Sequence, residues 1–266
     1  MLRMSVGSYK NQHPVKNGVP NADMTMADRH FLGVFDGVSG VADHGHRPEN
    51  YSWDLRNAMR HYFRQRVFSE SAEQFGKEVS SIVGPAGPAK GSWLRNLLVL
   101  AMSDCQLAGA TTLGVMSVMG KSVSWLHVGD VQLTVLRPFN NLRKLHVVFQ
   151  SRDQRRMIRT ADGREVECPS QVGIMSAEDM TMRNWIALAS QADFGKVGAQ
   201  AGDVLVACSD GITDNINQVA FLQKLPDLYF ANCSPTEMAK ELCEMGVASG
   251  VKPDDNSCAI GILCQM

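Results

Sequence analysis

In the segment FLGVFDGVSG at residues 31–40, an apolar run ends in a carboxylate and a turn of small residues. The run from Phe31 to Phe35 has the length and apolar content of a buried strand. Asp36 follows where such a strand ends, and Gly37 lets the backbone come close to whatever Asp36 binds. Taken alone, the pattern is also that of a strand followed by a tight turn.

Two later stretches also place an acidic residue at the end of an apolar strand. Residues 203–211 (DVLVACSDG) end in Asp210 and a glycine, and residues 253–264 (PDDNSCAIGILC) place Asp255 before an apolar run. Clustered carboxylates repel one another unless a hard cation neutralises them. Oxygen ligands without histidine or cysteine favour magnesium or manganese over zinc. The sequence therefore predicts a metal site, with aspartates that only cap turns as the alternative.

The chain resembles the metal-dependent serine/threonine protein phosphatases of type 2C. Five short stretches carry this resemblance in the family's order: Asp36-Gly37-Val38-Ser39-Gly40, Gly109-Ala110-Thr111-Thr112-Leu113, His127-Val128-Gly129-Asp130, Ser209-Asp210-Gly211-Ile212-Thr213-Asp214-Asn215 and Lys252-Pro253-Asp254-Asp255-Asn256-Ser257. The segment 167–172 (ECPSQV) and the short span from Asp23 to Asp36 are most similar to the compact branch that includes mitochondrial members.

The resemblance implies an α+β fold, in which two packed antiparallel β-sheets form a central β-sandwich flanked by helices. A binuclear metal site is expected at one end of this sandwich. Residues 1–266 would form one catalytic domain, with a flap-like insertion at about 151–201 beside the site. The residues agree with the fold class, since strands of period two after Ala110 are followed by helices without regular alternation.

The resemblance also implies roles for individual residues. Asp36 would bridge two Mn²⁺ or Mg²⁺ ions, the Gly37 carbonyl would complete one of them, and Asp210 and Asp255 would bind the other. Asp23 would hold a water molecule beside the ions. A third ion is doubtful, because its usual carboxylate position is occupied by Gln106, unless Asp104 or Asp214 replaces it.

Substrate contacts and a proton donor are less clearly marked. Lys16 lies near the position of an arginine that binds phosphate in some members, and Arg155 and Arg156 belong to a basic stretch suited to acidic flanks of a phosphoprotein. A solvated basic loop is the alternative. The family's histidine positions hold valines, so His44 or His46 becomes the candidate general acid, with exposed loop histidines as the alternative.

Composition limits the cellular setting and the partners. The 266 residues are 44% hydrophobic with a net charge of -1, and no apolar stretch approaches the roughly 20 residues that span a bilayer. We therefore expect a monomer with phosphorylated protein substrates and no nucleic-acid or membrane partner.

The seven cysteines form no CxxC pair, which favours free thiols in a reducing compartment, the cytoplasm or the mitochondrial matrix. A cysteine nucleophile is disfavoured, because the phosphate-cradling loop it needs is absent.

Periodicity predicts the main elements. A strand is expected at Leu2–Val6, a hairpin at 23–35, helices at 48–68, from Ser71 and at 92–107, and a linker at 84–88. Four consecutive antiparallel strands are expected at 110–119, 122–128, 131–136 and 144–149, and residues 151–201 show little periodicity. A capping box at Ser234 and Glu237 opens a late helix, and the last strand is 257–264.

The function predicted from these features is hydrolysis of phosphoserine and phosphothreonine on proteins by a metal-activated water. Two alternatives remain at this level. The chain could be a catalytically weak relative that binds a phosphopeptide or a partner, or a metal-dependent hydrolase of a small phosphate ester. The surface around the site sets whether the substrate is a protein or a small molecule.

Overall fold

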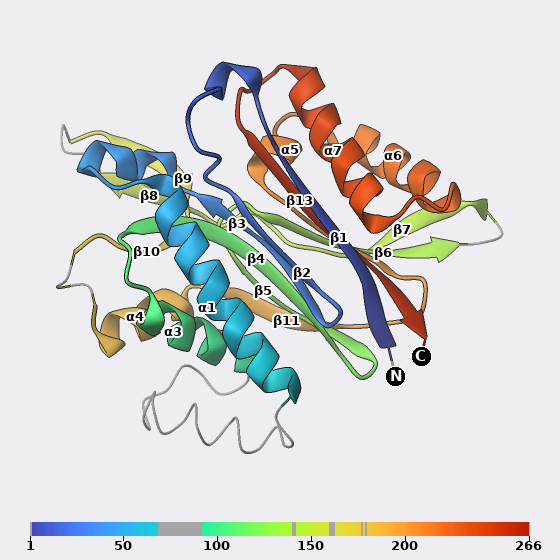
Figure 1. The fold of residues 1–266 in the computed structure, drawn as a ribbon, viewed down its shortest axis with the longest axis horizontal. Helices are drawn as coiled ribbons and strands as arrows, with labels where there is room; N and C mark the ends of the chain where they lie inside the picture. Colours follow the sequence, from blue (N-terminus) through green and yellow to red (C-terminus); the bar gives the residue numbers. More distant parts are fainter. Residues whose placement is uncertain are drawn as a thin grey trace.

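Two antiparallel β-sheets pack face to face at the centre of the computed structural model, which describes residues 2–68, 92–139, 142–159, 163–176, 178 and 180–265. The first has the order β1-β13-β12-β6-β7 (Leu2–Gln12, Asp255–Gln265, Val204–Cys208, Gln132–Phe139 and Lys144–Gln150). The second has the order β11-β5-β4-β3-β2 (Asp193–Gly198, Ser122–Val128, Gly109–Met119, Phe31–Gly37 and Met24–Asp28), with β10 (Val172–Ile174) also paired to β4. The predicted sandwich of the α+β class is confirmed (Figure 1).

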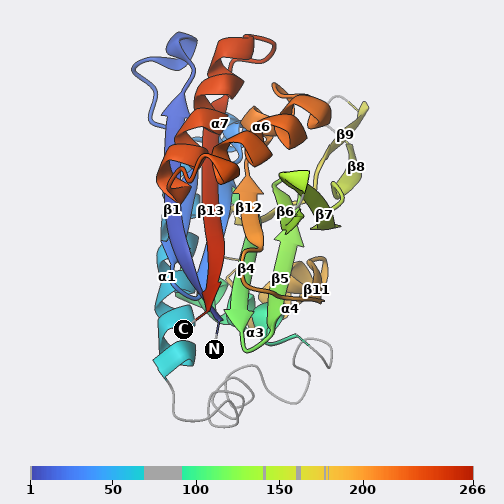
Figure 2. The same cartoon turned by 90° about the vertical axis from the view of Figure 1, so that its right-hand side faces the viewer.

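Helices cover the outer face of each sheet (Figure 2). The helices α1 (Pro48–Phe68), α3 (Trp93–Asp104) and α4 (Met182–Ser190) belong to the side of β4 and β5. The helices α5 (Asp210–Thr213), α6 (Gln218–Phe230) and α7 (Pro235–Ser249) cover the side of β12 and β13. The predicted capping box opens α7, where Ser234 and Glu237 satisfy each other's backbone N–H groups.

The strand β3 is apolar from Phe31 to Phe35, and these residues are buried on both faces of the strand. Its side chains alternate, so Leu32 and Val34 enter the core between the sheets, while Phe31 and Phe35 enter the core beneath α1 and α3. Phe31 stacks on Phe63 of α1 at 4.7 Å between ring centres. Two cores therefore meet on this one strand, just before Asp36.

Two predictions about local structure are wrong. The strands β5 and β6 do not pair, because the chain crosses from one sheet to the other after Val128. Residues 151–201 are not a long loop: they form a hairpin of β8 (Arg155–Arg159) and β9 (Glu165–Pro169), then β10, α4 and β11. Their exposed, polar strands lack the apolar alternation that marks a half-buried strand.

The predicted helix from Ser71 and the linker at 84–88 lie outside the described residues. Within the described ranges, no helix is both long and apolar enough to cross a membrane. The cysteines Cys208 and Cys258 face each other across β12 and β13 with their sulfurs 3.5 Å apart, and all seven cysteines are free thiols.

Candidate metal-dependent active site

The ends of strands from both sheets meet at one end of the sandwich. Because β12 and β13 are antiparallel, with Cys208 opposite Cys258, the end of β12 lies beside the start of β13. This pairing brings Asp210 and Asp255 together. Asp36 enters from the other sheet, and the Ala22 N–H donates to Asp255 Oδ2 at 2.9 Å, which ties the two sheets at this point.

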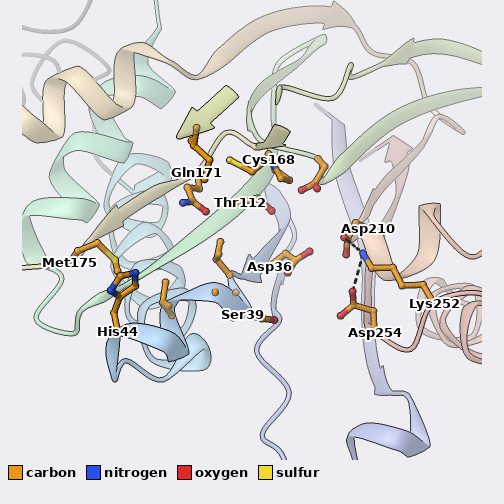
Figure 3. Close-up of a pocket in the computed structure, with 17 residues that line it drawn as sticks. Asp36, Ser39, His44, Thr112, Cys168, Gln171, Met175, Asp210, Lys252 and Asp254 are labelled. Atoms are coloured by element: carbon orange, nitrogen blue, oxygen red, sulfur yellow. Dashed lines mark hydrogen bonds and ion pairs between the residues drawn. The ribbon is translucent and has the colours of Figure 1, made fainter. Parts of the chain in front are cut away.

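A pocket of about 510 Å³ opens over these strand ends, and Figure 3 shows Asp36 near its centre. Asp210 and Lys252 lie on one side of Asp36, and His44 and Met175 lie on the other. The two aspartates Asp23 and Asp255 do not line the pocket and are almost fully buried. The predicted residues Asp23, Asp36, Asp210 and Asp255 are thus gathered at one place by the fold.

Two buried carboxylate oxygens at this place have no hydrogen-bond partner, Oδ2 of Asp23 and Oδ1 of Asp255. Burial and the charge of Asp255 raise the pKa of Asp23 to about 7. Burial and the charges of Asp23 and Asp210 raise the pKa of Asp36 well above its ordinary value. Unsatisfied buried oxygens and mutually repelling carboxylates are what a hard divalent cation relieves, so the donor set fits Mn²⁺ or Mg²⁺.

Two glycines allow the close approach that this convergence needs. A Cβ on Gly37 would lie 2.7 Å from the Ala22 carbonyl oxygen and 2.8 Å from that of Pro48. A Cβ on Gly211 would overlap the backbone carbonyl of Asp255. Glycine at these two positions therefore sets the spacing between Asp36, Asp210 and Asp255.

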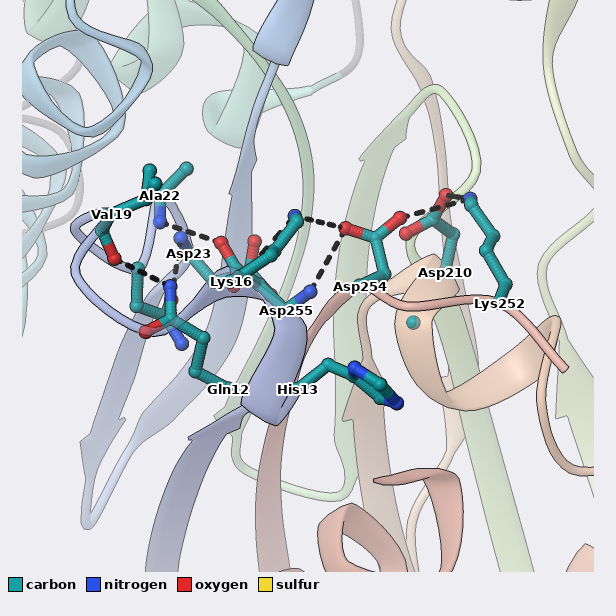
Figure 4. Close-up of polar contacts among 12 residues, drawn as sticks. Gln12, His13, Lys16, Val19, Ala22, Asp23, Asp210, Lys252, Asp254 and Asp255 are labelled. Atoms are coloured by element: carbon teal, nitrogen blue, oxygen red, sulfur yellow. Dashed lines mark hydrogen bonds and ion pairs between the residues drawn. The ribbon is translucent and has the colours of Figure 1, made fainter. Parts of the chain in front are cut away.

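Two lysines, shown in Figure 4, hold the outer carboxylates of the site. Lys252 Nζ lies 2.7 Å from Asp210 Oδ2 and 3.1 Å from Asp254 Oδ2. Lys16 Nζ lies 2.7 Å from Asp254 Oδ1 and 3.8 Å from Asp255 Oδ1. Among the described residues, no three acidic, histidine or cysteine side chains already surround one ion position. Ion binding would therefore require these side chains to rearrange around it.

Asp130 and Asp254 line the pocket without having been assigned a role from the sequence. Burial and the charge of Asp210 raise the pKa of Asp130 to about 6. Asp130 belongs to the stretch His127-Val128-Gly129-Asp130, which is part of the family resemblance and could have marked it as a site residue. Lys252 and Asp254 also belong to such a stretch, but their contacts with Asp210 and Lys16 could not be found by pattern, because these partners lie about 40 and 240 residues away in the chain.

The β8–β9 hairpin, which we call the flap hairpin (residues 155–169), forms the other wall through Ile158, Cys168 and Pro169. Its base is tied to the loop carrying Asp130, since the Gln154 N–H donates to the Gly129 carbonyl at 2.7 Å. The flap hairpin is therefore fixed at its base and exposed beyond it.

Some of the remaining predicted residues lie at the pocket and others do not. His44 lines the pocket, whereas His46 is half-buried and does not. Lys16 reaches the site through Asp254 and Asp255. Arg155 and Arg156 lie on the flap hairpin but do not line the pocket, and Arg155 makes a 3.8 Å ion pair with Asp153. The structure thus brings Lys16 and His44 to the site and leaves His46, Arg155 and Arg156 at its periphery.

Solved structures share this fold over nearly the whole chain. The photosystem II phosphatase PBCP matches with a TM-score of 0.67 and 20% identity, covering 97% of this chain and 98% of that one. The catalytic domain of the serine/threonine protein phosphatase PstP, in complex with two manganese ions, matches with a TM-score of 0.63 and 18% identity, covering 100% of both chains. The fold of the chain is therefore the fold of these phosphatases.

Sequence comparison points to the type 2C group. The chain is 25% identical over 248 residues to the probable protein phosphatase 2C 80 of Arabidopsis thaliana, covering 92% of this chain and 49% of that protein. It is 24% identical over 260 residues to the human protein phosphatase PTC7 homolog, covering 88% and 75%. The chain spans about half the length of the Arabidopsis relative. No protein-family model matches. The predicted resemblance to type 2C phosphatases is confirmed.

Proposed function

We propose that this protein hydrolyses phosphoserine and phosphothreonine esters on proteins at a two-ion Mn²⁺ or Mg²⁺ site. The observation that carries the proposal is the pair of buried oxygens beside Asp36, Asp23 Oδ2 and Asp255 Oδ1, that accept no hydrogen bond, although the Lys16 ammonium lies 3.8 Å from the second. The presence of two manganese ions in the PstP structure, which has the same fold, supports the choice of ion.

The residues that would hold the ions are Asp36, the Gly37 carbonyl, Asp210 and Asp255, and Asp23 would orient a water molecule. Two bound cations would supply charge neutralisation of the phosphate oxygens and an activated water. The chain itself contributes a pocket with an acidic floor and a wall from the flap hairpin, which would orient the phosphorylated side chain over Asp36.

Hydrolysis of a phosphothreonine peptide by metal-stripped protein tests the function directly. We expect turnover only after Mn²⁺ or Mg²⁺ is added, and its loss when a chelator is added, because the clustered carboxylates need cations. Restoring Mn²⁺ after chelation should restore the rate, which controls for irreversible damage. Full turnover by the metal-stripped protein would contradict the proposal. Turnover of an aryl phosphate without any peptide turnover would favour a small-ester hydrolase.

A histidine is the proposed general acid, since expelling a serine or threonine alkoxide needs a proton donor more than expelling a phenolate does. His44 lines the pocket and is exposed, so it can reach a leaving group. Replacing His44 and His46 together with alanine should slow phosphothreonine-peptide hydrolysis roughly 10²-fold and aryl phosphate hydrolysis far less.

The matched control for the histidines is His61→Ala, an exposed histidine on α1 that contacts Gln65. This control should leave both rates unchanged. An unchanged ratio of peptide to aryl phosphate rates in the double variant would remove both histidines from the mechanism.

The basic side chains of the flap hairpin are proposed to select substrates with acidic flanks. Arg155→Glu together with Arg156→Glu should raise KM for an acidic phosphopeptide severalfold while changing KM for an aryl phosphate little, because these residues lie outside the pocket. Arg3→Glu, at the end of β1 opposite the site, is a control for the effect of reversing one surface charge away from the site. Equal effects on both substrates would assign the two arginines to the fold instead.

The cellular setting is part of the same proposal. Seven free thiols, including the facing pair Cys208 and Cys258, support a reducing compartment such as the cytoplasm or the mitochondrial matrix. We propose a monomer whose partners are phosphorylated proteins, with no nucleic-acid or membrane partner.

A further inference from the structure

Three side chains lie in a row across the pocket and toward the flap hairpin. Asp36 on β3 pairs directly with Thr112 on β4. The pairing of β10 with β4 sets Val172 opposite Thr111, which places Gln171 beside Thr112 at the next position. Cross-strand neighbours project to the same face of a sheet, and both Thr112 and Gln171 line the pocket (Figure 3). The row therefore runs from the proposed ion site to the flap side of the pocket.

The two members of the row beyond Asp36 are uncharged and have unused hydrogen-bonding capacity. Thr112 is 4% exposed, and its Oγ1 is buried without a hydrogen-bond partner among the described residues. The side-chain amide of Gln171 is half-buried and makes no hydrogen bond to any described residue. Buried polar groups in proteins are nearly always paired. Two unpaired neighbours in a pocket wall therefore indicate a polar ligand that lies along them.

The backbone around Gln171 is fixed on both sides. Before it, the Ser170 N–H donates at 2.8 Å to the backbone carbonyl that precedes the flap hairpin. After it, the fully buried Val172 begins β10. Gly129 leaves room for this arrangement, since a Cβ there would lie 2.6 Å from the Ser170 carbonyl oxygen and 2.6 Å from Cγ2 of Thr112. The fold thus presents the Gln171 amide at a set place in the wall.

The groups on the two sides of Asp36 suit different parts of a substrate. Asp210 and Lys252, on one side, are charged and suit ions and a phosphate. The amide of Gln171, beside the apolar side chain of Ile158, offers N–H donors and a carbonyl acceptor. A peptide group offers the complementary acceptor and donor, whereas a simple alkyl or aryl phosphate has no such group. The backbone of a phosphorylated residue is only a few bonds from its phosphorus, so it can reach this row.

We propose that Gln171 binds a peptide group of the substrate next to the phosphorylated side chain, with the Thr112 hydroxyl beside it, and so selects phosphorylated polypeptides over small phosphate esters. This inference rests on the proposed phosphatase function. It makes Gln171 a specificity-determining residue, while the phosphate and its ester bond stay over Asp36. Gln171 does not distinguish between sequences, because every polypeptide carries peptide groups.

The test compares a phosphothreonine peptide with an aryl phosphate, both with Mn²⁺ present. Gln171→Met keeps the length of the side chain and removes its amide. It should lower kcat/KM for the peptide roughly 30-fold, the scale of two neutral hydrogen bonds, and for the aryl phosphate by less than about twofold.

Two depsipeptides, in which an ester replaces the amide before or after phosphothreonine, separate backbone binding from an effect on the leaving group. At least one of them should be hydrolysed severalfold more slowly than the peptide by wild type. Gln171→Met should show no such difference, because the group that binds the amide is already gone.

Gln223→Met, at an exposed glutamine on α6, is the matched control and should keep both rates. Gln171→Asn draws the amide back by one methylene, so it should lose the same selectivity, and it serves if Gln171→Met does not fold. Equal losses on both substrates, or no loss on either, in a folded variant would overturn the inference and leave the phosphatase function intact. Wild type that hydrolyses neither substrate with Mn²⁺ would instead overturn the proposed function.

Discussion

Replacing Asp36 or Asp255 by asparagine should lower phosphothreonine-peptide turnover by roughly 10³-fold, the scale at which charge-stabilising groups act in active sites. Asparagine keeps the size of the side chain but removes the negative charge and offers an N–H donor where an oxygen ligand is needed. Both aspartates lie at the point where the two sheets meet. Two of the neighbouring carboxylates, Asp210 and Asp254, are already paired with lysines.

The same variants should leave the metal-free protein as stable as wild type, or more stable. Burial and the charges of Asp23 and Asp210 raise the pKa of Asp36, so the ionised carboxylate is disfavoured in the folded state. A neutral amide removes that repulsion. Wild type should be stabilised by added Mn²⁺, and the variants much less.

Thermal melting in chelator and in Mn²⁺, beside steady-state turnover, checks both expectations. Asp227→Asn, an exposed change on α6, is the matched control and should behave as wild type. Near-full turnover of Asp36→Asn or Asp255→Asn at saturating Mn²⁺ would show that the replaced residue is not an ion ligand.

The elements with a strong period were predictable from sequence, and those held by distant partners were not. The helix α1 has its predicted bounds, and β3 was found because burial on both faces makes it continuously apolar. The strand β11 was missed, because it pairs at the edge of a sheet and carries no fully buried side chain. Its pairing with β5 depends on the position of β5 rather than on its own pattern.

The residues of the site also divide into those that local pattern located and those that are held by distant partners. Asp36, Asp210 and Asp255 each follow or precede an apolar strand, so local pattern located them, and the antiparallel pairing of β12 and β13 brings the last two together. The role of Lys252 depends on the buried amide of Asn215 and on carboxylates from two segments of the chain. No periodicity encodes that arrangement, because it exists only after the sandwich has closed.

Gly211→Ala should be the most destabilising single methyl addition at the site, lowering the free energy of unfolding by about 3 kcal/mol. The new Cβ would overlap the carbonyl of Asp255, and backbone atoms cannot rotate away as a side chain can. Alanine favours a helix over glycine by roughly 1 kcal/mol, so the gain in α5 is smaller than the steric cost. Relief requires α5 and the start of β13 to separate, which also moves Asp210 away from Asp255.

Urea denaturation in chelator measures the loss of stability, and calorimetric Mn²⁺ titration measures the accompanying loss of affinity. The matched control is Gly198→Ala at the end of β11, where an added Cβ would meet no atom within 4 Å. That variant should unfold at the same urea concentration as wild type. Wild-type stability and Mn²⁺ affinity in Gly211→Ala would contradict the prediction. In that case the spacing of the two aspartates would not depend on contact between α5 and β13. Destabilisation with unchanged affinity would separate the two roles, because it would show that bound ions pull the strand ends back into place.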